Sequence, residues 1–565
     1  MSQSKRHLTR LLLGMAALAA LPTSARAWEP NDGDLAEAIK AGDFTGYLAN
    51  ISAWLNGKTP AADKISEPAM LGLLKDPVVA KTLAQRQFIA KHGADKLGEF
   101  AKADPANAKF LGWLLPNAEA MDLYLVGATP TGLAKREKND SALPIEALDL
   151  WRKIHDTDPD SAKGLYLKLA IAVALSPPPK MSYVGAHGIG SVPIDPVERY
   201  THYKTAHKNG ELFPIFNDLT VWEYRKVVCD WASTPELAWA REMLNTWRPD
   251  LRREQQVHSI VSEVWRRTSP IPYSKGFPTV MEGGGKCGPR SWFGTMMCRA
   301  FGIPAVGVGQ PGHAAFGIKA ADPNSQPQPG AVWKAVYGRA WHVSKAEGVA
   351  GPEFVAEAEA RAREPGFSQG EHLRWLAAAL TSKDQADAVL EVVRKVQPPV
   401  PARDDGVVAR PVAGSGCPGT DRSSPMPACK PVPEPPIKAA PGVLHVEAEA
   451  FADMAGVCVY DCSTGGKQVN FQKNIESSWV DYKIDVPETG TYELTLRVAT
   501  PNRDQALDLG CGEEKLATIQ VPNTTGLWGT TEPVSVKLNK GTQTLRFSAP
   551  YQRGIAVRWF ELKPK

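Results

Sequence analysis

No apolar run in the sequence is long enough to span a bilayer, which takes about 20 residues. Two apolar stretches, residues 11–21 and 165–175, are each too short. The first follows three basic residues and precedes small residues that end at Ala27. This arrangement is typical of a secretory signal peptide, so we predict that residues 1–27 are removed and that the mature chain is not inserted in a membrane. The predicted location is periplasmic or extracellular, and a retained N-terminal anchor is the weaker alternative.

A basic stripe is also missing. The chain has 65 Lys and Arg against 61 Asp and Glu, but four of the basic residues and none of the acidic ones lie in the predicted signal peptide. The mature chain is therefore formally neutral, and we find no cluster of Lys and Arg along it. Nucleic acid is not expected as a partner, because binding to phosphates requires such a cluster.

Cysteine is sparse, with eight in 565 residues, and the central cysteines show no metal-site spacing. In an exported protein, cysteines tend to pair as disulfides. Cys417 and Cys429 lie in a proline-rich stretch, where they can close a small loop. The sequence leaves the other pairings open. If Cys287 is a working thiol, seven cysteines remain, so at least one more is unpaired.

The length implies several domains, because 565 residues are too many for one hydrophobic core. Apolar residues three and four apart predict a mainly helical domain over residues 28–249. Residues 250–396 predict an α+β core with helices at its C-terminal end. Helical patterns lie at residues 253–267 and from 289 to about 301, β-prone segments lie at 303–309, 313–320 and 331–338, and three further helical patterns start near Pro352, Ser368 and Ser382. Residues 397–442 are rich in Pro, Gly and Ser and predict a semi-rigid linker. Alternating apolar and polar residues predict a β-sandwich over residues 443–565.

Three helical patterns are clear in the first domain, at residues 76–93, 161–175 and 234–247. The last follows Ser233, a good N-cap, and has a proline in its first turn. An irregular aromatic segment, residues 199–228, lies between the second and third. Its rings can line a binding cleft, although packing between helices is the interpretation that we favour.

In the central region three glycines lead to Cys287 at the predicted start of a helix. Unpaired amide groups and the helix dipole favour a thiolate at such a position, and glycines allow tight backbone geometry and close approach of a substrate. His313 follows 26 residues later on a β-prone segment, where it can return to the sulfur as general base and then as general acid. The alternative is a buried thiol and a core histidine without a catalytic role.

The stretch KCGPRSWFGTMMCRAFGIPAVGV, residues 286–308, resembles the nucleophile helix and following strand of the transglutaminase-like, papain-related superfamily. GHAAFGI, residues 312–318, is similar to its histidine strand, and VSEVWRRTSPIPY, residues 261–273, to the segment that precedes its cysteine. The resemblance implies an α+β core with a Cys-His-Asp triad that acts on amide bonds and needs no cofactor. Members include acyltransferases, proteases and peptide:N-glycanases.

The sequence departs from that superfamily at the third member of the triad. An Asp or Asn usually lies on the strand after the histidine, but residues 331–341 contain neither an acid nor an amide. Asp322 is the nearest carboxylate downstream of His313, and it can orient the imidazole. Otherwise the site is a Cys-His dyad.

Three further side chains are weaker candidates. Arg290 should lie on a face of the helix next to Cys287, where it can bind a substrate carboxylate and lower the thiol pKa, or form a surface ion pair. Glu282 can be the partner of Arg290. In glycosidic or lyase chemistry Glu282 and Tyr273 can act as acid or base, but no second carboxylate completes a glycosidase pair.

Four C-terminal segments have a distinctive order and spacing: residues 444–456, 478–502, 521–547 and 554–563. They resemble a family 6 carbohydrate-binding module, which implies a β-sandwich that binds glycans through aromatic side chains in loops and holds a structural calcium. By position, the resemblance implies Trp528 as the stacking residue, opposed by Tyr460 or Phe471. The alternative for the opposing rings is packing between the sheets.

The resemblance also implies a calcium ligand in the acidic segment that holds Glu447 and Glu449. The last strand departs from the family, because Ala556 and Val557 stand where an asparagine often bonds the sugar. That departure indicates a weaker or displaced sugar site.

Together these features predict a secreted, glycan-targeted enzyme whose Cys287 and His313 act on an amide bond of a glycoconjugate, as an amidase, peptidase or acyltransferase. Its partner is expected to be a polysaccharide or glycoconjugate. The first alternative is a polysaccharide depolymerase, either a lyase or a glycoside hydrolase, that uses the same cleft. The second is a non-catalytic glycan-binding protein on a degenerate transglutaminase-like scaffold.

Overall fold

The computed structural model describes nine stretches of the chain. They are residues 28–138, 142–176, 194–269, 271–273, 276–320, 332–397, 442–471, 478–549 and 554–565. The predicted signal peptide, Asp322, Cys417, Cys429 and all but the two ends of the predicted linker lie outside them. Within these stretches no helix is both long enough and apolar enough to cross a bilayer.

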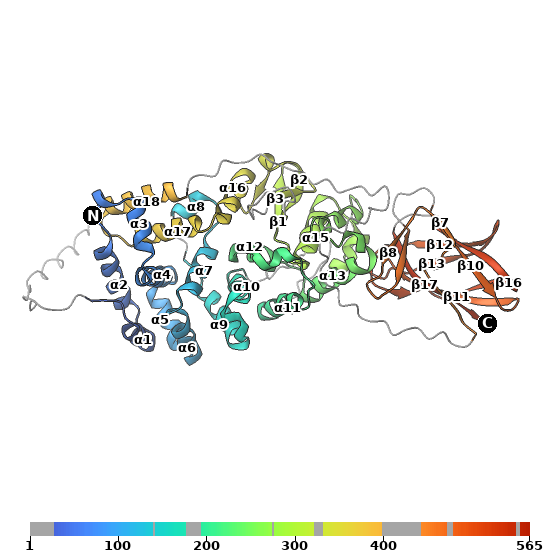
Figure 1. Cartoon of the computed structure of the whole chain (residues 1–565), viewed down its shortest axis with the longest axis horizontal. Helices are drawn as coiled ribbons and strands as arrows, with labels where there is room; N and C mark the ends of the chain where they lie inside the picture. The colour runs from blue at the N-terminus through green and yellow to red at the C-terminus, as the bar shows by residue number, and fades with distance from the viewer. Residues whose placement is uncertain are drawn as a thin grey trace, which may run out of the picture.

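The described residues form a helical region, a mixed central region and a β-sandwich, which follow one another along an elongated molecule (Figure 1). The N-terminal helices lie at one end and the C-terminal strands at the other. This arrangement confirms the predicted multidomain class with a helical N-terminal region and a C-terminal β-sandwich.

The helical region consists of short helices packed around a shared apolar core. Its α-helices are α1 (Asp32–Ala41), α2 (Thr45–Lys58), α3 (Glu67–Leu74), α4 (Pro77–His92), α5 (Ala94–Ala103), α6 (Pro105–Leu114), α7 (Ala118–Ala128), α8 (Leu133–Lys138), α9 (Ile145–Thr157), α10 (Gly164–Leu175), α11 (Pro196–Lys208), α12 (Val221–Val228) and α13 (Thr234–Trp247). The three helices predicted from apolar spacing are confirmed as α4, α10 and α13. Ser233 caps α13 as predicted, in a reciprocal pair of bonds with Glu236.

The aromatic segment at residues 199–228 is mostly helical and not irregular, since it holds most of α11, a 3₁₀ turn at Pro214–Asp218, and α12. Its rings pack inward: Tyr203 stacks on Phe216, and Tyr224 meets the edge of Phe216. All three rings are fully buried. The structure therefore supports packing, and not a cleft, for these aromatics.

The central region is built on a five-stranded antiparallel sheet that α15 packs against. Its elements are α14 (Val280–Gly283), α15 (Cys287–Ala300), β1 (Ala305–Gln310), β2 (His313–Ala320), β3 (Val332–Val336), β4 (Lys345–Ala346) and β5 (Val349–Ala350). The strand order is β3-β2-β1-β4-β5. The helix predicted from residue 289 to about 301 and the three predicted strands are confirmed as α15 and β1 to β3. The α+β arrangement does not by itself assign a superfamily.

The helix predicted over residues 253–267 is wrong apart from a 3₁₀ stretch at Val257–Glu263. Beyond it the chain is extended, and its backbone pairs with the loop before Cys287. The Gly285 amide donates to the Trp265 carbonyl at 2.8 Å, and the Arg267 amide donates to the Gly285 carbonyl at 3.2 Å. Tertiary pairing has overridden the local helical pattern here, because these bonds satisfy the backbone that a helix would otherwise satisfy.

Three helices after the sheet run back along the N-terminal helices (Figure 1). They are α16 (Gly351–Ala362), α17 (Gly366–Ala377) and α18 (Lys383–Val396), and their starts confirm the helices predicted near Pro352, Ser368 and Ser382. The helices that follow the central sheet therefore pack against the N-terminal helices.

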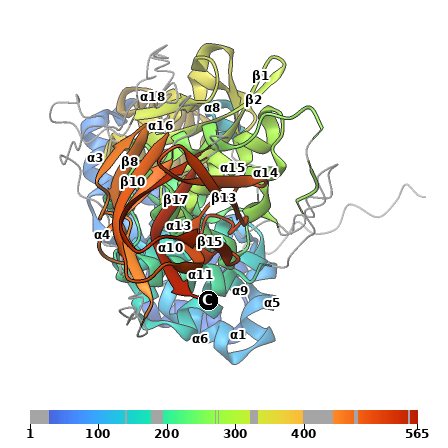
Figure 2. The same cartoon turned by 90° about the vertical axis from the view of Figure 1, so that its right-hand side faces the viewer.

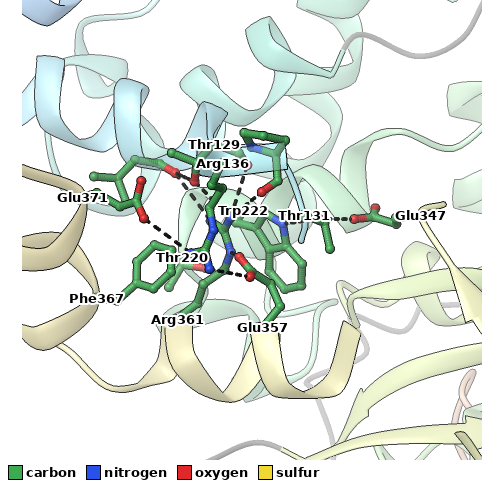
Figure 3. A network of polar contacts seen from close by, with 12 residues as sticks. Thr129, Thr131, Arg136, Thr220, Trp222, Glu347, Glu357, Arg361, Phe367 and Glu371 are labelled. Carbon is green, nitrogen blue, oxygen red and sulfur yellow. Dashed lines mark hydrogen bonds and ion pairs between the residues drawn. The ribbon is translucent and has the colours of Figure 1, made fainter. Parts of the chain in front are cut away.

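A buried ion network joins these returning helices to the N-terminal ones (Figure 3). Arg136 bonds Glu357 at 3.0 Å and Glu371 at 3.4 Å, while Arg361 bonds Glu357 at 2.7 Å. The four side chains are between 3% and 6% exposed. Arg361 also donates to the hydroxyl of Thr129 at 2.9 Å. We call Arg136, Glu357, Arg361 and Glu371 the helical seam.

The C-terminal region is a sandwich of two antiparallel sheets over one apolar core. Its strands are β6 (Leu444–Glu447), β7 (Asp453–Ala455), β8 (Val457–Asp461), β9 (Lys467–Phe471), β10 (Trp479–Val486), β11 (Gly490–Ala499), β12 (Gln505–Cys511), β13 (Glu514–Val521), β14 (Gly529–Thr530), β15 (Val534–Leu538), β16 (Gly541–Ser548) and β17 (Ile555–Pro564). One sheet has the order β13-β12-β16-β10-β7, and the other contains β14-β11-β17-β9-β8 with β15 beside β11 and β6 beside β17. Seen end-on, the sandwich lies in front of the rest of the molecule (Figure 2).

Candidate functional site

Cys287 occupies the first position of α15 and carries a free, half-buried thiol. Lys286 precedes it at the N-cap without a side-chain cap, so no side chain competes for the unpaired amides of the first turn. Those amides can donate hydrogen bonds to a negatively charged group at this end of the helix. Cys298 on the same helix is different, because complete burial raises the pKa of its thiol and keeps it protonated.

The glycines before Cys287 are explained by packing. A Cβ on Gly283 would lie 2.6 Å from the Tyr273 ring, and one on Gly284, whose φ is +64°, would lie 2.5 Å from the Trp265 carbonyl oxygen. Tyr273 is 1% exposed, and its hydroxyl donates to the Gly284 carbonyl. Tyr273 is therefore a structural residue under the loop, which argues against its predicted role as an acid or base.

The contact between α15 and β2 brings the thiol end of the helix to the histidine end of the strand. Ser291, one turn after Cys287, donates its hydroxyl proton to the Ala315 carbonyl at 2.6 Å. Ala315 lies two residues after His313, on the same face of β2. Tyr337 links Cys287 and His313, because its ring lies 5.6 Å from the His313 ring and its hydroxyl interacts electrostatically with Cys287. No hydrogen bond joins these two described residues.

The hydrogen bond of His313 defines which ring nitrogen is free. Its Nε2 lies 2.7 Å from the carbonyl oxygen of Tyr337, directly after β3. A carbonyl only accepts, so Nε2 must carry the proton and donate it. The neutral imidazole then has its lone pair on Nδ1, as a general base requires. The carbonyl of Tyr337 thus does the orienting that was expected of an Asp or Asn.

The turn that presents this carbonyl is itself held in place. Tyr337 has a φ of +59°, in the left-handed region that non-glycine residues seldom adopt. Gln310, at the end of β1, brackets the turn: its amide donates to the Arg339 carbonyl at 2.8 Å and its oxygen accepts from the Arg339 amide at 2.9 Å. Sequence reasoning missed Tyr337 and Gln310, and the only signal was Gly338, a turn residue at the end of the strand.

Arg290 lies one turn into α15, where its guanidinium stacks on the Tyr337 ring at 4.5 Å. It also donates to the Val261 carbonyl at 3.3 Å, and within the described residues it has no carboxylate partner. Burial lowers the pKa of Arg290, and the neighbouring Tyr337 and Cys287 act in the opposite direction. These interactions place Arg290, Tyr337 and Cys287 in one cluster. A substrate carboxylate could bind the uncompensated cation.

The predicted pairing of Glu282 with Arg290 is wrong. Glu282 is 5% exposed and pairs with Arg503 of the sandwich at 2.7 Å. Its second oxygen accepts from the side-chain amide of Asn523, also of the sandwich. Both carboxylate oxygens are thus engaged, so Glu282 is poorly placed to act as an acid or base.

The predicted sugar-binding residues fall in three different environments. Trp528 is half-buried and packs against the core of the helical and central regions, with its indole nitrogen buried and unpaired. Phe471 is 1% exposed in the core of the sandwich, so the packing alternative holds for it and it cannot stack on a sugar. Tyr460 is half-buried on β8. Ala556 is fully buried in the same core that Trp528 packs against.

The predicted calcium ligands have a different partner in the structure. Glu447 forms an ion pair with Arg558 and a hydrogen bond with His445, whereas Glu449 is exposed. The guanidinium of Arg558 thus already pairs with the Glu447 carboxylate that a calcium ion would need. No group of three or more His, Cys, Asp or Glu side chains in the described part of the chain is arranged to hold a metal. The residues present do not fit a calcium site at Glu447, and calcium binding stays a prediction.

The cysteines of the sandwich also differ from one another. Cys458 is disulfide-bonded, whereas Cys462 and Cys511 are free thiols, as are Cys229 and Cys298 elsewhere in the described chain. The expectation that at least one cysteine besides Cys287 is unpaired is therefore met.

Comparison with known proteins gives a match for the C-terminal region. Residues 447–564 match the model of the carbohydrate binding module (family 6). The chain is similar to the C-terminal module of LamC, a laminarinase from Zobellia galactanivorans, at 28% identity, over 21% of this chain and 98% of that one, with a TM-score of 0.20. It is similar to a module of Cellvibrio mixtus lichenase 5A, solved with cellotriose, at 24% identity, over 22% and 97%, with a TM-score of 0.20.

A third similar structure is a β-1,3-glucan-binding module from Bacillus halodurans, at 22% identity, over 21% of this chain and 95% of that one, with a TM-score of 0.19. No curated protein matches the chain. The family match covers the described sandwich, apart from its two ends. Residues 447–564 therefore match a carbohydrate-binding module of family 6, and this match supports a protein that is targeted to glycans.

Proposed function

We propose that this protein is a secreted, glycan-targeted thiol enzyme that cleaves or transfers an amide bond of a glycoconjugate, with Cys287 as nucleophile and His313 as general base and acid. The observation that carries the proposal is the bond between His313 Nε2 and the Tyr337 carbonyl at 2.7 Å. It leaves Nδ1 free to take a proton at the end of the sheet where the free thiol of Cys287 lies at a helix N-terminus. His313 is half-buried and not part of the fully buried core.

The reaction takes two steps. In the first, His313 Nδ1 accepts the thiol proton, Cys287 Sγ attacks the amide carbonyl carbon, and the C–N bond breaks as the proton passes from His313 to the leaving nitrogen. A thioester on Cys287 remains. In the second, water or an acceptor amine attacks the thioester carbonyl, His313 takes the proton of the attacking group, and that proton returns to Sγ as the C–S bond breaks. A carboxylic acid or a new amide is released.

The surroundings suggest an anionic substrate. Arg290 lies beside Cys287 without a carboxylate partner among the described residues, and Arg266 is exposed where its backbone pairs with Gly285. Two uncompensated guanidinium groups attract a carboxylate, which is common in glycopeptides, peptidoglycan and acidic polysaccharides. The family 6 module supports a glycan as the larger part of the substrate.

The test is turnover by the Cys287→Ser variant on glycopeptide, peptidoglycan and amide-bearing polysaccharide, measured as released amine. Serine at this position keeps the size of the side chain but lacks the ready thiolate, so turnover should fall about a thousandfold or more. Cys511→Ser is the matched control, because Cys511 is also a half-buried free thiol, and it should retain wild-type turnover.

Three outcomes would contradict the proposal. Wild-type turnover in Cys287→Ser would remove the thiol from the chemistry. New reducing or unsaturated sugar ends without released amine would identify a depolymerase, although Tyr273 and Glu282 are both engaged in structural bonds. Glycan binding without any product would identify a non-catalytic binding protein.

A further inference from the structure

The loop end of the carbohydrate-binding module is covered by the central and helical regions. Ala499 at the end of β11 and Ala556 on β17 are fully buried in the apolar core of those regions, and Leu527 and Trp528 pack against it. In the cartoon, β8 and β17 lie beside α13 (Figure 1). A module tethered only by a linker would leave this end open to solvent.

Three indole groups of the neighbouring regions donate hydrogen bonds into the module loops. Trp239 donates to the Thr525 carbonyl at 3.0 Å, and Trp247 donates to the Gly554 carbonyl at 3.1 Å. The third, Trp265, donates to the side-chain oxygen of Asn502 at 3.1 Å. We call these contacts, together with the other contacts described below between the module and the two regions beside it, the module seam.

Two amides of the module donate in the other direction. Gln468 donates to the Thr246 carbonyl at 2.9 Å, and Asn470 donates to the Trp247 carbonyl at 2.8 Å. Both side chains are at most 4% exposed. Buried polar groups from both sides of the seam are thus matched to one another, as in a permanent interface.

Two glycines of the module allow the closest approach. A Cβ on Gly526, whose φ is +81°, would lie 2.5 Å from Met243 Cγ, and one on Gly554, whose φ is +84°, would lie 2.8 Å from the Trp247 ring. No side chain fits at either place. The module therefore meets α13 at a defined position, and Trp528 lies inside the interface.

The seam reaches the segment that leads to Cys287 from two directions. Glu282 accepts hydrogen bonds from Arg503 and Asn523 of the module. It lies five residues before Cys287, the first residue of α15. Trp265, whose indole binds Asn502, holds the same segment by its backbone bond to Gly285. The module thus contacts the segment from 282 to 286 directly at Glu282 and, through Trp265, indirectly at Gly285.

We propose that Arg503 and Asn523 of the module are positioning residues for Cys287: they fix Glu282, and through it the loop that sets the N-terminus of α15. The carbohydrate-binding module is then a part of the catalytic site and not a mobile anchor. The catalytic role of Cys287 rests on the proposed function, whereas the effect of Arg503 and Asn523 on the loop does not, so an experiment can contradict either claim alone.

The variants are Arg503→Ala, Asn523→Ala and their combination in the full-length protein, with Arg503→Lys as the conservative change. Arg546→Ala is a matched control, because Arg546 of the module also pairs with a buried carboxylate, Asp481, and is 46% exposed against 48% for Arg503. The first readout is amide hydrogen exchange over residues 280–288. The second is the pH profile of alkylation of Cys287, resolved by mass spectrometry.

We expect exchange over residues 280–288 to rise about tenfold in the double variant, because two bonds to a charged group that hold the loop are lost. The midpoint of the Cys287 alkylation profile should shift to higher pH as the helix N-terminus loosens. Arg503→Lys should restore most of both effects, and Arg546→Ala should produce neither. A merely structural pairing would change thermal stability without moving the alkylation profile.

Unchanged exchange over residues 280–288 in the double variant would overturn the proposal. Faster exchange with an unchanged alkylation profile would overturn it as well, since the loop would then not position the thiol. Should Cys287→Ser keep its turnover while both readouts shift as expected, the proposed function falls and the link between the module and the thiol loop stands.

Discussion

The helical seam and the module seam both join segments that are far apart in the sequence, but they use different chemistry. The helical seam is made of charges: Arg136, Glu357, Arg361 and Glu371 are almost completely removed from solvent and compensate one another. The module seam is made mainly of neutral donors on carbonyl oxygens, and Arg503 in its ion pair is half exposed. A buried charge that loses its partner is far more costly than a lost neutral bond. Removal of one residue from the helical seam should therefore lower the free energy of unfolding strongly, whereas removal of one bond from the module seam should lower it only slightly.

The largest effect is expected from Arg361→Ala. This change leaves Glu357 with one guanidinium partner fewer inside the protein, and breaking a buried pair in this way costs about 3–5 kcal/mol. The free energy of unfolding, measured in urea by circular dichroism at a helical wavelength, should fall by that amount. Arg394→Ala is the control, because Arg394 and Glu391 form a pair that is 67% and 64% exposed, and it should change the same quantity by less than about 1 kcal/mol. Equal effects of the two variants would mean that burial does not set the cost of breaking the helical seam.

A smaller, pH-dependent effect should be confined to the helical region. Burial lowers the pKa of His92 in α4 to about 3, whereas an unfolded histidine titrates near about 6.5. Between these values the unfolded chain binds more protons, so the free energy of unfolding falls as the pH drops below about 6.5. From pH 6.5 to 4.5 the loss attributable to His92 should be about 2 kcal/mol.

His92→Phe should flatten this part of the pH dependence. The comparison is His342→Gln, an exposed histidine of the central region, which should leave the slope unaltered. A slope that survives in His92→Phe would mean that other buried groups carry the acid sensitivity of the helical region.

The smallest effect is expected at the module seam. Trp247→Phe keeps an aromatic ring against Gly554 but removes the N–H that reaches its carbonyl oxygen. The loss of one neutral hydrogen bond should cost about 0.5–1.5 kcal/mol and raise hydrogen exchange locally in β17. Trp341→Phe removes an indole bond to the Trp333 carbonyl away from the seam and should leave exchange in β17 as it is. A collapse of the whole fold in Trp247→Phe would show that this seam, too, fails as a unit.

The parts of the fold that follow from local pattern were predictable from the sequence. The alternation of the C-terminal strands and the capped start of α13 depend on neighbouring residues, and both predictions are confirmed. Cys287 and His313 were likewise placed on the helix and strand where the structure has them. The helix predicted over residues 253–267 is wrong because backbone pairing with Gly285 is a tertiary effect that no local pattern records.

The partners within the site were not predictable, for two reasons. The group that orients His313 is a backbone carbonyl, that of Tyr337, and a carbonyl has no residue type by which a sequence can reveal it. The partner of Glu282 is Arg503, which lies in a different region of the chain, so only the docking of the module brings the two together. Trp528 shows the same limit, because its position in the module suggested a sugar and its surroundings are protein.

The two glycines at the module seam, Gly526 and Gly554, make this module a poor candidate for exchange with another. A substitute module with any side chain at Gly526 or Gly554 would clash with Met243 or Trp247. If residues 442–565 were grafted onto another protein, the buried Ala499 and Ala556, with the half-buried Trp528, would become an apolar patch open to water. Such a chimera should aggregate or self-associate unless that patch is redesigned.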